Sequence, residues 1–112
     1  MNSPITTHVL NTHLGRPAAG IRATLDRLQN EEWVNVAHAQ AGASGRIDQW
    51  CEGGLVAGTY RIRFDTDAYF VSLGEQSFYP DVVISFRITN PKEHYHVPLL
   101  ISAHGYCTYR GS

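Results

Sequence analysis

Histidine is the residue type in this chain with the clearest capacity for chemistry, because its imidazole gains and loses a proton near neutral pH. The 112 residues include 6 histidines. Two of them, His94 and His96, lie in a segment whose apolar residues occupy alternate positions: Tyr95, Val97, Leu99 and Ile101. This alternation predicts a half-buried strand. The two histidines therefore share its outer face, about 6.5–7 Å apart, where they could act in acid–base catalysis.

A third histidine shows the same phase in the N-terminal segment. Ile5 and Val9 share the apolar side of the expected strand 5–10, so His8 points to the opposite face. These outer faces are not simply polar. Leu10 lies on the same face as His8, and Pro98 and Leu100 lie on the same face as His96. A mixed histidine, proline and leucine face suggests a second buried surface, such as a subunit interface.

A zinc site is the alternative use of the histidine pair. Alternating strand residues such as His94 and His96 can converge on one metal, but zinc needs a third and usually a fourth ligand. His8, His104 and Cys107 are the available types, and none of them stands in a recognisable ligand motif. We therefore expect no metal.

Other catalytic motifs are absent from the sequence. The segment 42–46 is rich in glycine but lacks the Gly-Lys-Ser/Thr ending of a phosphate-binding loop. Ser112 does not lie in a Gly-x-Ser-x-Gly motif, which excludes a serine hydrolase of the α/β kind. Cys51 and Cys107 form no Cys-x-x-Cys pair, so we expect two free thiols in a reducing compartment.

The charge balance excludes further classes of partner. Lys plus Arg is 9 and Asp plus Glu is 10, giving a net charge of −1 with His neutral. We expect no nucleic acid, which requires a basic face, and no membrane, because there is neither a polybasic segment nor an apolar run of about 18 residues. The first residues, Met1–Pro4, show no signal-peptide pattern. We therefore expect a cytoplasmic location.

The elements that must position these side chains are mostly strands. Alternation is strong in residues 59–65, 82–89 and 94–102 and weaker in 5–10, 21–28, 33–38 and 106–110. Turn residues separate the runs, among them Gly53-Gly54. One short helix is expected over residues 68–73, capped by Asp67 and ended by Gly74. Seven or eight strands with one helix predict a single all-β domain, residues 1–112, folded as an antiparallel β-sandwich.

Several blocks of the chain resemble one family. The segment 91–100 and the terminal Tyr109-Arg110-Gly111-Ser112 resemble the 5-hydroxyisourate hydrolases, the enzymatic branch of the transthyretin-like family. The segments 6–10, 15–18 and 78–84 and the pair Gly45-Arg46 match as well. The terminal tetrapeptide is the most specific block, because the hormone-carrying transthyretins lack both it and the histidine pair.

The resemblance implies a fold, an assembly and a reaction. The fold is the transthyretin-like (prealbumin-like) sandwich of two four-stranded sheets with one short helix. The assembly is a homotetramer, a dimer of dimers with active sites at the dimer–dimer interface. The reaction opens the ring of 5-hydroxyisourate to 2-oxo-4-hydroxy-4-carboxy-5-ureidoimidazoline in urate degradation towards allantoin. No cofactor is implied. The alternative function is a transthyretin-like small-molecule carrier without catalysis.

The resemblance also implies the site residues. His8, Arg46, His96 and Ser112 match the catalytic positions, and His8, Arg46 and Tyr109 match substrate-binding positions. Either His96 or His8 would act as the general base. Arg46 would hold the substrate's carbonyl groups and stabilise oxyanion charge. Ser112 would orient the water or a histidine, or donate to the ring.

The face of the terminal strand stays open in the sequence pattern. Either Tyr106, Thr108 and Arg110 face the cleft, or Cys107 and Tyr109 do. The resemblance favours the second arrangement, which would bring Cys107 near the site without assigning it a role.

Overall fold

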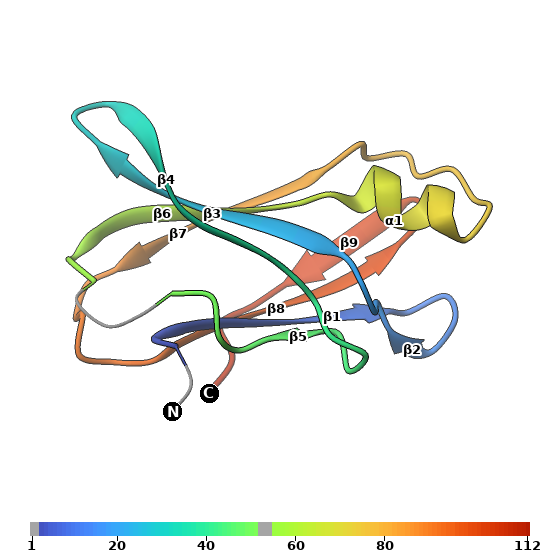
Figure 1. Cartoon of the computed structure of the whole chain (residues 1–112), viewed down its shortest axis with the longest axis horizontal. Helices are drawn as coiled ribbons and strands as arrows, with labels where there is room; N and C mark the ends of the chain where they lie inside the picture. Colours follow the sequence, from blue (N-terminus) through green and yellow to red (C-terminus); the bar gives the residue numbers. More distant parts are fainter. Residues whose placement is uncertain (1–2, 52–54) are drawn as a thin grey trace.

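The computed structural model describes residues 3–51 and 55–112. Its elements follow one another along the chain as nine strands and one helix within this described part (Figure 1). They are β1 (Ile5–Asn11), β2 (Arg16–Pro17), β3 (Arg22–Gln29), β4 (Glu32–Gln40), β5 (Arg46–Ile47), β6 (Gly58–Phe64), α1 (Thr66–Ser72), β7 (Val82–Ile88), β8 (Tyr95–Ser102) and β9 (Gly105–Thr108). The Gly53-Gly54 turn expected from the sequence lies outside the described residues.

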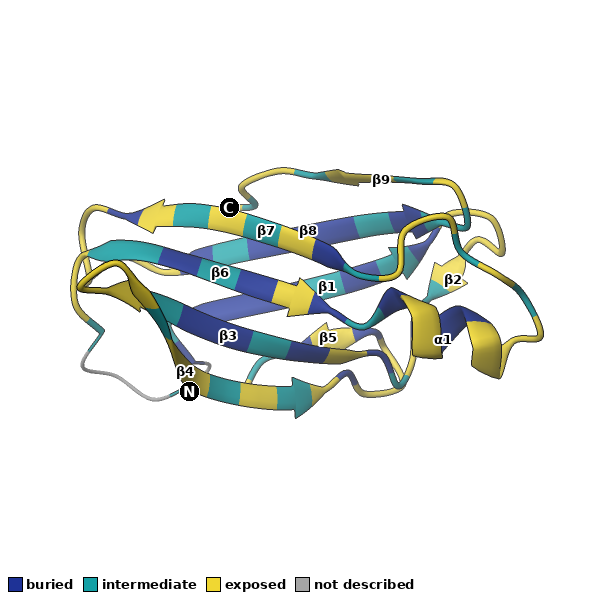
Figure 2. Cartoon of the chain, turned by 90° about the horizontal axis from the view of Figure 1, so that it is seen from above, coloured by how far each residue is buried: buried dark blue, intermediate teal, exposed yellow. Residues whose placement is uncertain are grey.

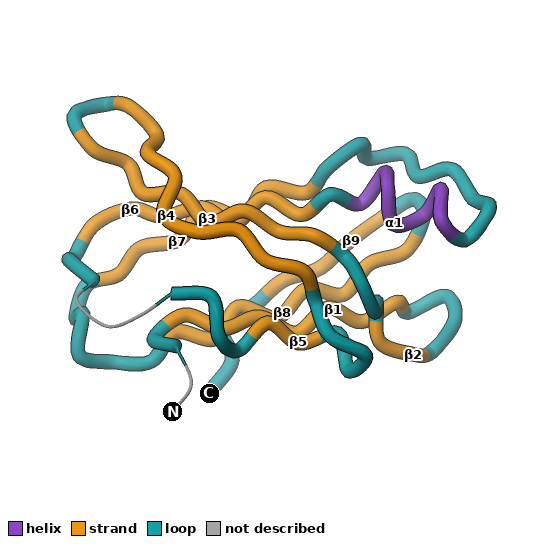
Figure 3. The backbone as a smooth tube through the Cα atoms, in the orientation of Figure 1, coloured by secondary structure: helices purple, strands orange, loops and turns teal. Residues whose placement is uncertain are grey.

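Two sheets pack face to face, as the sequence predicted (Figures 1 and 3). One sheet has the strand order β4-β3-β6-β7. The other has the order β2-β1-β8-β9, with β5 also paired to β1. This second sheet thus has five strands rather than four, because the two-residue strands β2 and β5 both pair with β1. Both are too short to give an alternating sequence pattern.

One strand pair departs from the antiparallel arrangement expected. β1 and β8 run parallel along their whole length, from Ile5 opposite Tyr95 to Asn11 opposite Ile101. All other strand pairs in the described residues are antiparallel. The parallel pair has a functional consequence, since it joins the strand that carries His8 to the strand that carries His96 although 88 positions separate them in the chain.

Alternation of burial along the strands follows the predicted phase (Figure 2). The inward-facing side chains of both sheets form one apolar cluster, whose fully buried members include Val9, Leu25, Tyr60, Ile62, Phe64 and Leu99. Each such side chain contributes about 1.5–3 kcal/mol when it is fully removed from water. A core of this size holds β1 and β8 in place, so that their outer faces can carry polar residues.

The helix lies where the sequence predicted, but its cap differs. Asp65, not Asp67, is the N-cap, and its carboxylate accepts a hydrogen bond from the Ala68 backbone N–H at 3.2 Å. Asp67 is already inside the first turn, where its negative charge favours the helix N-terminus. Gly74 follows the helix with φ of 75°, as expected of a residue that ends it. No helix among the described residues is long and apolar enough to cross a bilayer.

Candidate active site

Three strands of the five-stranded sheet bring the predicted histidines and Arg46 together on one outer face. In the antiparallel pair of β1 and β5, His8 lies directly opposite Arg46. In the parallel pair of β1 and β8, His8 lies opposite Pro98 and Thr6 lies opposite His96. Because residues directly opposite one another share a face of the sheet, this register brings Arg46, His8, Thr6 and His96 onto a single surface.

A buried threonine links the two histidines of β8 and its preceding turn. The Thr6 hydroxyl lies 2.7 Å from Nδ1 of His96 and 3.0 Å from Nε2 of His94. The imidazole rings are nearly parallel, with 18° between their planes and 6.4 Å between their centroids. Thr6 is only 2% exposed, so its hydroxyl depends on these two rings for its hydrogen bonds.

His8 makes a hydrogen bond that fixes which of its ring nitrogens carries the hydrogen in the neutral form. Its Nε2 lies 2.9 Å from the carbonyl oxygen of Ser44. A carbonyl oxygen can only accept, so Nε2 carries the hydrogen and donates it. In the neutral ring the lone pair is then on Nδ1. The backbone of the loop before β5 therefore keeps His8 in one tautomer.

Gly45 allows the loop before β5 to approach β1 closely. Its φ is +79°, and a Cβ atom there would meet the carbonyl oxygen of Val9 and lie 3.0 Å from Cβ of Pro17. The Gly45 carbonyl in turn accepts a hydrogen bond from the Val9 N–H at 2.8 Å. A residue with a side chain would push the loop away, so Gly45 sets the position of Arg46 beside His8.

The surroundings of His96 lower the pKa of its imidazole below the ordinary value of 6.5. Partial burial is the largest cause, followed by the positive charge of Arg46 and by His94 and His8, while Asp48 acts in the opposite direction. His96 is therefore neutral at pH 7. A pKa shifted in this way by both burial and nearby charges is frequent at functional sites.

The C-terminal residues run back along β8 and contact His96. The backbone N–H of Gly111 donates to the His96 carbonyl oxygen at 2.8 Å, which extends the pairing of β9 with β8. A Cβ atom on Gly111 would lie 2.5 Å from Cδ2 of His96. The His96 ring thus lies against the bare backbone of Gly111, and Ser112 is the next residue.

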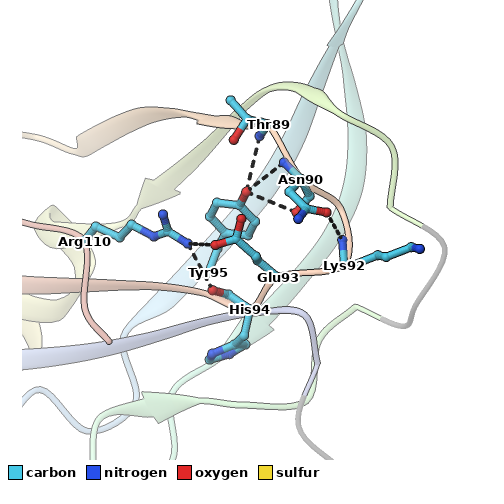
Figure 4. A network of polar contacts seen from close by, with 7 residues as sticks. All are labelled: Thr89, Asn90, Lys92, Glu93, His94, Tyr95 and Arg110. Carbon is cyan, nitrogen blue, oxygen red and sulfur yellow. Dashed lines mark hydrogen bonds and ion pairs between the residues drawn. The ribbon is translucent and has the colours of Figure 1, made fainter.

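Arg110 anchors this C-terminal segment (Figure 4). Its guanidinium lies 4.5 Å from the centre of the Tyr95 ring and 3.2 Å from a Glu93 carboxylate oxygen. The Tyr95 hydroxyl donates to the Asn90 carbonyl and accepts from the Thr89 and Asn90 N–H groups, which holds the ring in place. The arginine that the resemblance left without a role therefore ties residues 109–112 to the segment that leads into β8.

The structure does not bring every predicted site residue to the histidines. Tyr109 is 58% exposed and lines a hollow of about 450 Å³ between β7 and the C-terminal segment. Among the described residues, neither Tyr109 nor Ser112 has a side-chain hydrogen bond to His8, Arg46 or His96. The register pairs Leu100 with Cys107 and His96 with Gly111, so that position 109 falls opposite Pro98. Cys107 and Tyr109 therefore belong to the same face of the sheet as His96, in agreement with the second arrangement of the terminal strand.

No metal centre is formed by the described part of the chain, which contains no group of three or more His, Cys, Asp or Glu placed to hold an ion.

Thr6 is the residue that the sequence analysis missed. It belongs to the matched segment 6–10 and lies in phase with His8, so the alternation already assigns it to the outer face. The contact of Thr6 with His94 and His96 could be recognised only from the parallel pairing of β1 with β8.

Comparisons with known proteins agree with this geometry. The model of the HIUase/Transthyretin family matches residues 5–111. The 5-hydroxyisourate hydrolase of Mus musculus is 42% identical over 99% of this chain and 97% of its own length. The structure of Klebsiella pneumoniae 5-hydroxyisourate hydrolase is 35% identical, with a TM-score of 0.84 over 96% of this chain and 98% of that one. Sea bream transthyretin in complex with thyroxine is 27% identical, with a TM-score of 0.91 over 96% and 94% of the two chains.

Proposed function

The chain belongs to the HIUase/Transthyretin family, and we propose that it uses the outer face of β1, β5 and β8 to open the ring of 5-hydroxyisourate. The protein is an enzyme of the hydrolase branch, and its reaction belongs to urate degradation. One observation supports the location of the site above all others: His8, Arg46 and His96 lie on one face of three adjacent strands.

The reaction requires water to add to a ring carbonyl and the adjacent C–N bond to break. A base takes one proton from the water, the carbonyl oxygen becomes an oxyanion, and the departing ring nitrogen gains a proton. The product is 2-oxo-4-hydroxy-4-carboxy-5-ureidoimidazoline. A neutral histidine provides the base at pH 7, a contribution of about 10²–10⁴-fold. Arg46 supplies N–H donors to the oxyanion. No cofactor is needed for these steps.

The C-terminal segment contributes Tyr109 and Ser112 to the same site in this proposal. Gly111 contacts His96, and Ser112 is the next residue in the chain. Ser112 orients the attacking water or donates to the substrate ring. Tyr109 binds the substrate from its exposed position on the same segment.

Assembly follows from the apolar residues beside the histidines. Leu10 and Leu100 are directly opposite each other on the outer face and only half-buried in the single chain. We propose a homotetramer, a dimer of dimers in which two such faces enclose the substrate at the dimer–dimer interface. Enclosure excludes bulk water and strengthens the interaction of Arg46 with the oxyanion.

The carrier function is the weaker alternative. The sea bream transthyretin has the same fold, but its identity of 27% is below the 42% of the mouse hydrolase. A carrier has no use for a histidine with a lowered pKa beside an arginine, or for a threonine hydroxyl shared by two imidazoles. These features favour catalysis over storage or transport.

A direct assay tests the function. 5-Hydroxyisourate is generated in situ by urate oxidase, and the decay of its absorbance is followed with and without the protein. Because the substrate also decays by itself, the measured quantity is the increase in rate. We expect a large increase for the wild type and almost none for His8→Ala, with Arg63→Gln on the other sheet as a control. A wild-type rate equal to the spontaneous one would leave the carrier function.

We propose that the protein works in a reducing compartment, the cytoplasm. We also propose that residues 1–112 act as one domain. Cys51 and Cys107 are both free thiols, and the buried residues of both sheets join in one apolar cluster. Cell fractionation with an antibody against the protein tests the location. Recovery from an oxidising compartment would contradict it.

A further inference from the structure

We propose that Thr6 and His94 act as positioning residues that keep His96 as a neutral hydrogen-bond donor, so that His8 is the general base. The inference rests on the proposed hydrolysis of 5-hydroxyisourate and assigns a role to each histidine of that site. It also gives His94 and Thr6, to which the family resemblance assigns no role, a defined task in the reaction.

The argument begins with the single proton of the Thr6 hydroxyl. This hydroxyl can donate one hydrogen bond, and it has an imidazole nitrogen on each side. If it donates to one histidine, it must accept from the other. The two possible arrangements give opposite tautomers to His96, so the direction of this pair of hydrogen bonds decides what His96 can do.

The two distances indicate the direction. O–H···O hydrogen bonds are about 2.7–2.8 Å long and N–H···O hydrogen bonds about 2.9–3.0 Å, so an O–H donor gives the shorter contact. The contact of Thr6 with Nδ1 of His96 is 2.7 Å and its contact with Nε2 of His94 is 3.0 Å. The geometry therefore matches Thr6 donating to His96 while accepting from Nε2–H of His94.

This arrangement determines the state of His96. Its Nδ1 lone pair is occupied by the Thr6 hydroxyl, so the neutral ring carries its hydrogen on Nε2. Protonation of Nδ1 would require Thr6 to turn its hydrogen away from a buried position. Partial burial, the positive charge of Arg46 and the neighbouring His94 and His8 also disfavour an imidazolium and lower the pKa of His96, whereas Asp48 favours the imidazolium. His96 thus offers an N–H group to the oxyanion or to the departing ring nitrogen.

His8 has the opposite arrangement. Its Nε2–H is donated to the Ser44 carbonyl, which leaves the lone pair of Nδ1 without a partner among the described residues. Of the two histidines in the proposed site, only His8 retains a lone pair that can take a proton from water. The two rings therefore divide the work. His8 removes a proton from the water and, as the imidazolium, returns it to the departing ring nitrogen, while His96 donates a hydrogen bond to the substrate and keeps its proton.

Nitrogen chemical shifts of the histidine rings test this assignment directly. We would record ¹⁵N spectra of the labelled full-length protein at pH 7.5, assigning His96 through its loss in His96→Gln. We expect a protonated Nε2 and an unprotonated Nδ1 in His96, and the same tautomer in His8. A hydrogen on Nδ1 of His96 would overturn the proposal.

Near-isosteric substitutions at position 94 test the role of the relay. Glutamine at this position can still donate to Thr6, whereas glutamate can only accept. We expect His94→Gln to retain the His96 tautomer and kcat within about tenfold. We expect His94→Glu to move the His96 hydrogen to Nδ1 and to lower kcat by about 10²-fold with a smaller change in KM. Equal tautomers and equal rates in the two variants would overturn the proposal.

A second pair of variants removes or keeps the hydroxyl itself. Thr6→Ser keeps it and should rescue both the tautomer and the rate, while Thr6→Val has a similar shape without it and should lose both. Thermal melting of each variant shows whether it folds. A wild type without hydrolase activity would refute the proposed function alone, because the ring spectra would still decide the direction of the hydrogen bonds.

Discussion

Gly111 forms the surface against which the imidazole of His96 packs. Its N–H donates to the His96 carbonyl at 2.8 Å, and a Cβ atom at this position would lie 2.5 Å from Cδ2 of His96 and 3.3 Å from Cγ of Pro98. Real Cβ atoms do not approach other heavy atoms so closely. Glycine is therefore required here for space rather than for an unusual backbone conformation.

Replacing Gly111 with alanine should displace the ring that it supports. We expect Gly111→Ala to lower kcat by about 10- to 10²-fold, because small displacements of a catalytic group are costly. The melting temperature should change little, since the residue lies outside the core. The control is Gly105→Ala in the same β8–β9 region, where the nearest atom to a new Cβ is Oγ of Ser102 at 3.8 Å. Equal activity of the two variants would contradict the packing argument.

Arg110 should affect activity more than stability. Both it and Glu93 are about half exposed, with side-chain exposures of 56% and 50%, and exposed ion pairs contribute only about 0–1 kcal/mol to folding. Its effect is to hold residues 109–112 against β8. We expect Arg110→Gln to lower kcat/KM about tenfold or more while the melting temperature stays within a few degrees.

Arg63→Gln is the matched control for Arg110. Arg63 forms a similarly exposed pair with Asp81 at 3.8 Å on the other sheet. The measurement is steady-state hydrolysis together with thermal melting of both variants. If Arg63→Gln loses as much activity as Arg110→Gln, the loss reflects general destabilisation and the anchoring role is wrong.

The local parts of the site were predictable from the sequence. The outer position of His8, His94 and His96 follows from alternation, because side chains of a strand alternate between its two faces. The helix was also predicted, although its cap was placed at Asp67 rather than Asp65. An aspartate at either position can cap, and only the backbone conformation distinguishes them.

The contacts between distant segments were not predictable. Arg46 lies beside His8 because a two-residue strand pairs with β1, and so short a strand has no periodicity to detect. Thr6 meets His94 and His96 because β1 and β8 are parallel partners, an arrangement that a pattern of alternating residues cannot distinguish from an antiparallel one. These contacts depend on register, which each strand's own sequence does not specify.

The lowered pKa of His96 should make stability sensitive to mildly acidic pH. Below the ordinary imidazole value of 6.5 the unfolded chain takes up a proton at this position more readily than the folded protein does. The contribution of His96 to stability is therefore complete above about pH 6.5 and is lost as the pH falls through the lowered folded value. Urea unfolding at pH 7.5 and 5.5 should show a larger loss for the wild type than for His96→Gln. Equal losses would contradict the shift.

Removal of metal ions should leave the reaction unchanged. The described residues contain no group of three or more His, Cys, Asp or Glu placed to hold an ion. The ring nitrogens of His94 and His96 that approach each other both bond to the hydroxyl of Thr6. Two ligands are too few for a zinc site. We expect dialysis against a chelator to preserve the full rate. A loss that zinc restores would demand a metal-dependent mechanism.

Leu100 should control both assembly and activity. Leu100 and its register partner Leu10 lie half-buried on the outer face of the sheet that carries the histidines, and in the proposed tetramer they pack against the opposite dimer. A glutamate at position 100 would bury a charge at that interface, which is costly without a partner. We expect Leu100→Glu to sediment as a smaller species and to lose most hydrolysis while its strands stay folded. Val36→Glu is the control, because Val36 is 38% exposed on β4 of the other sheet. A Leu100→Glu protein that remains fully active as a monomer would show that one chain completes the site alone, and the interface location would then be wrong.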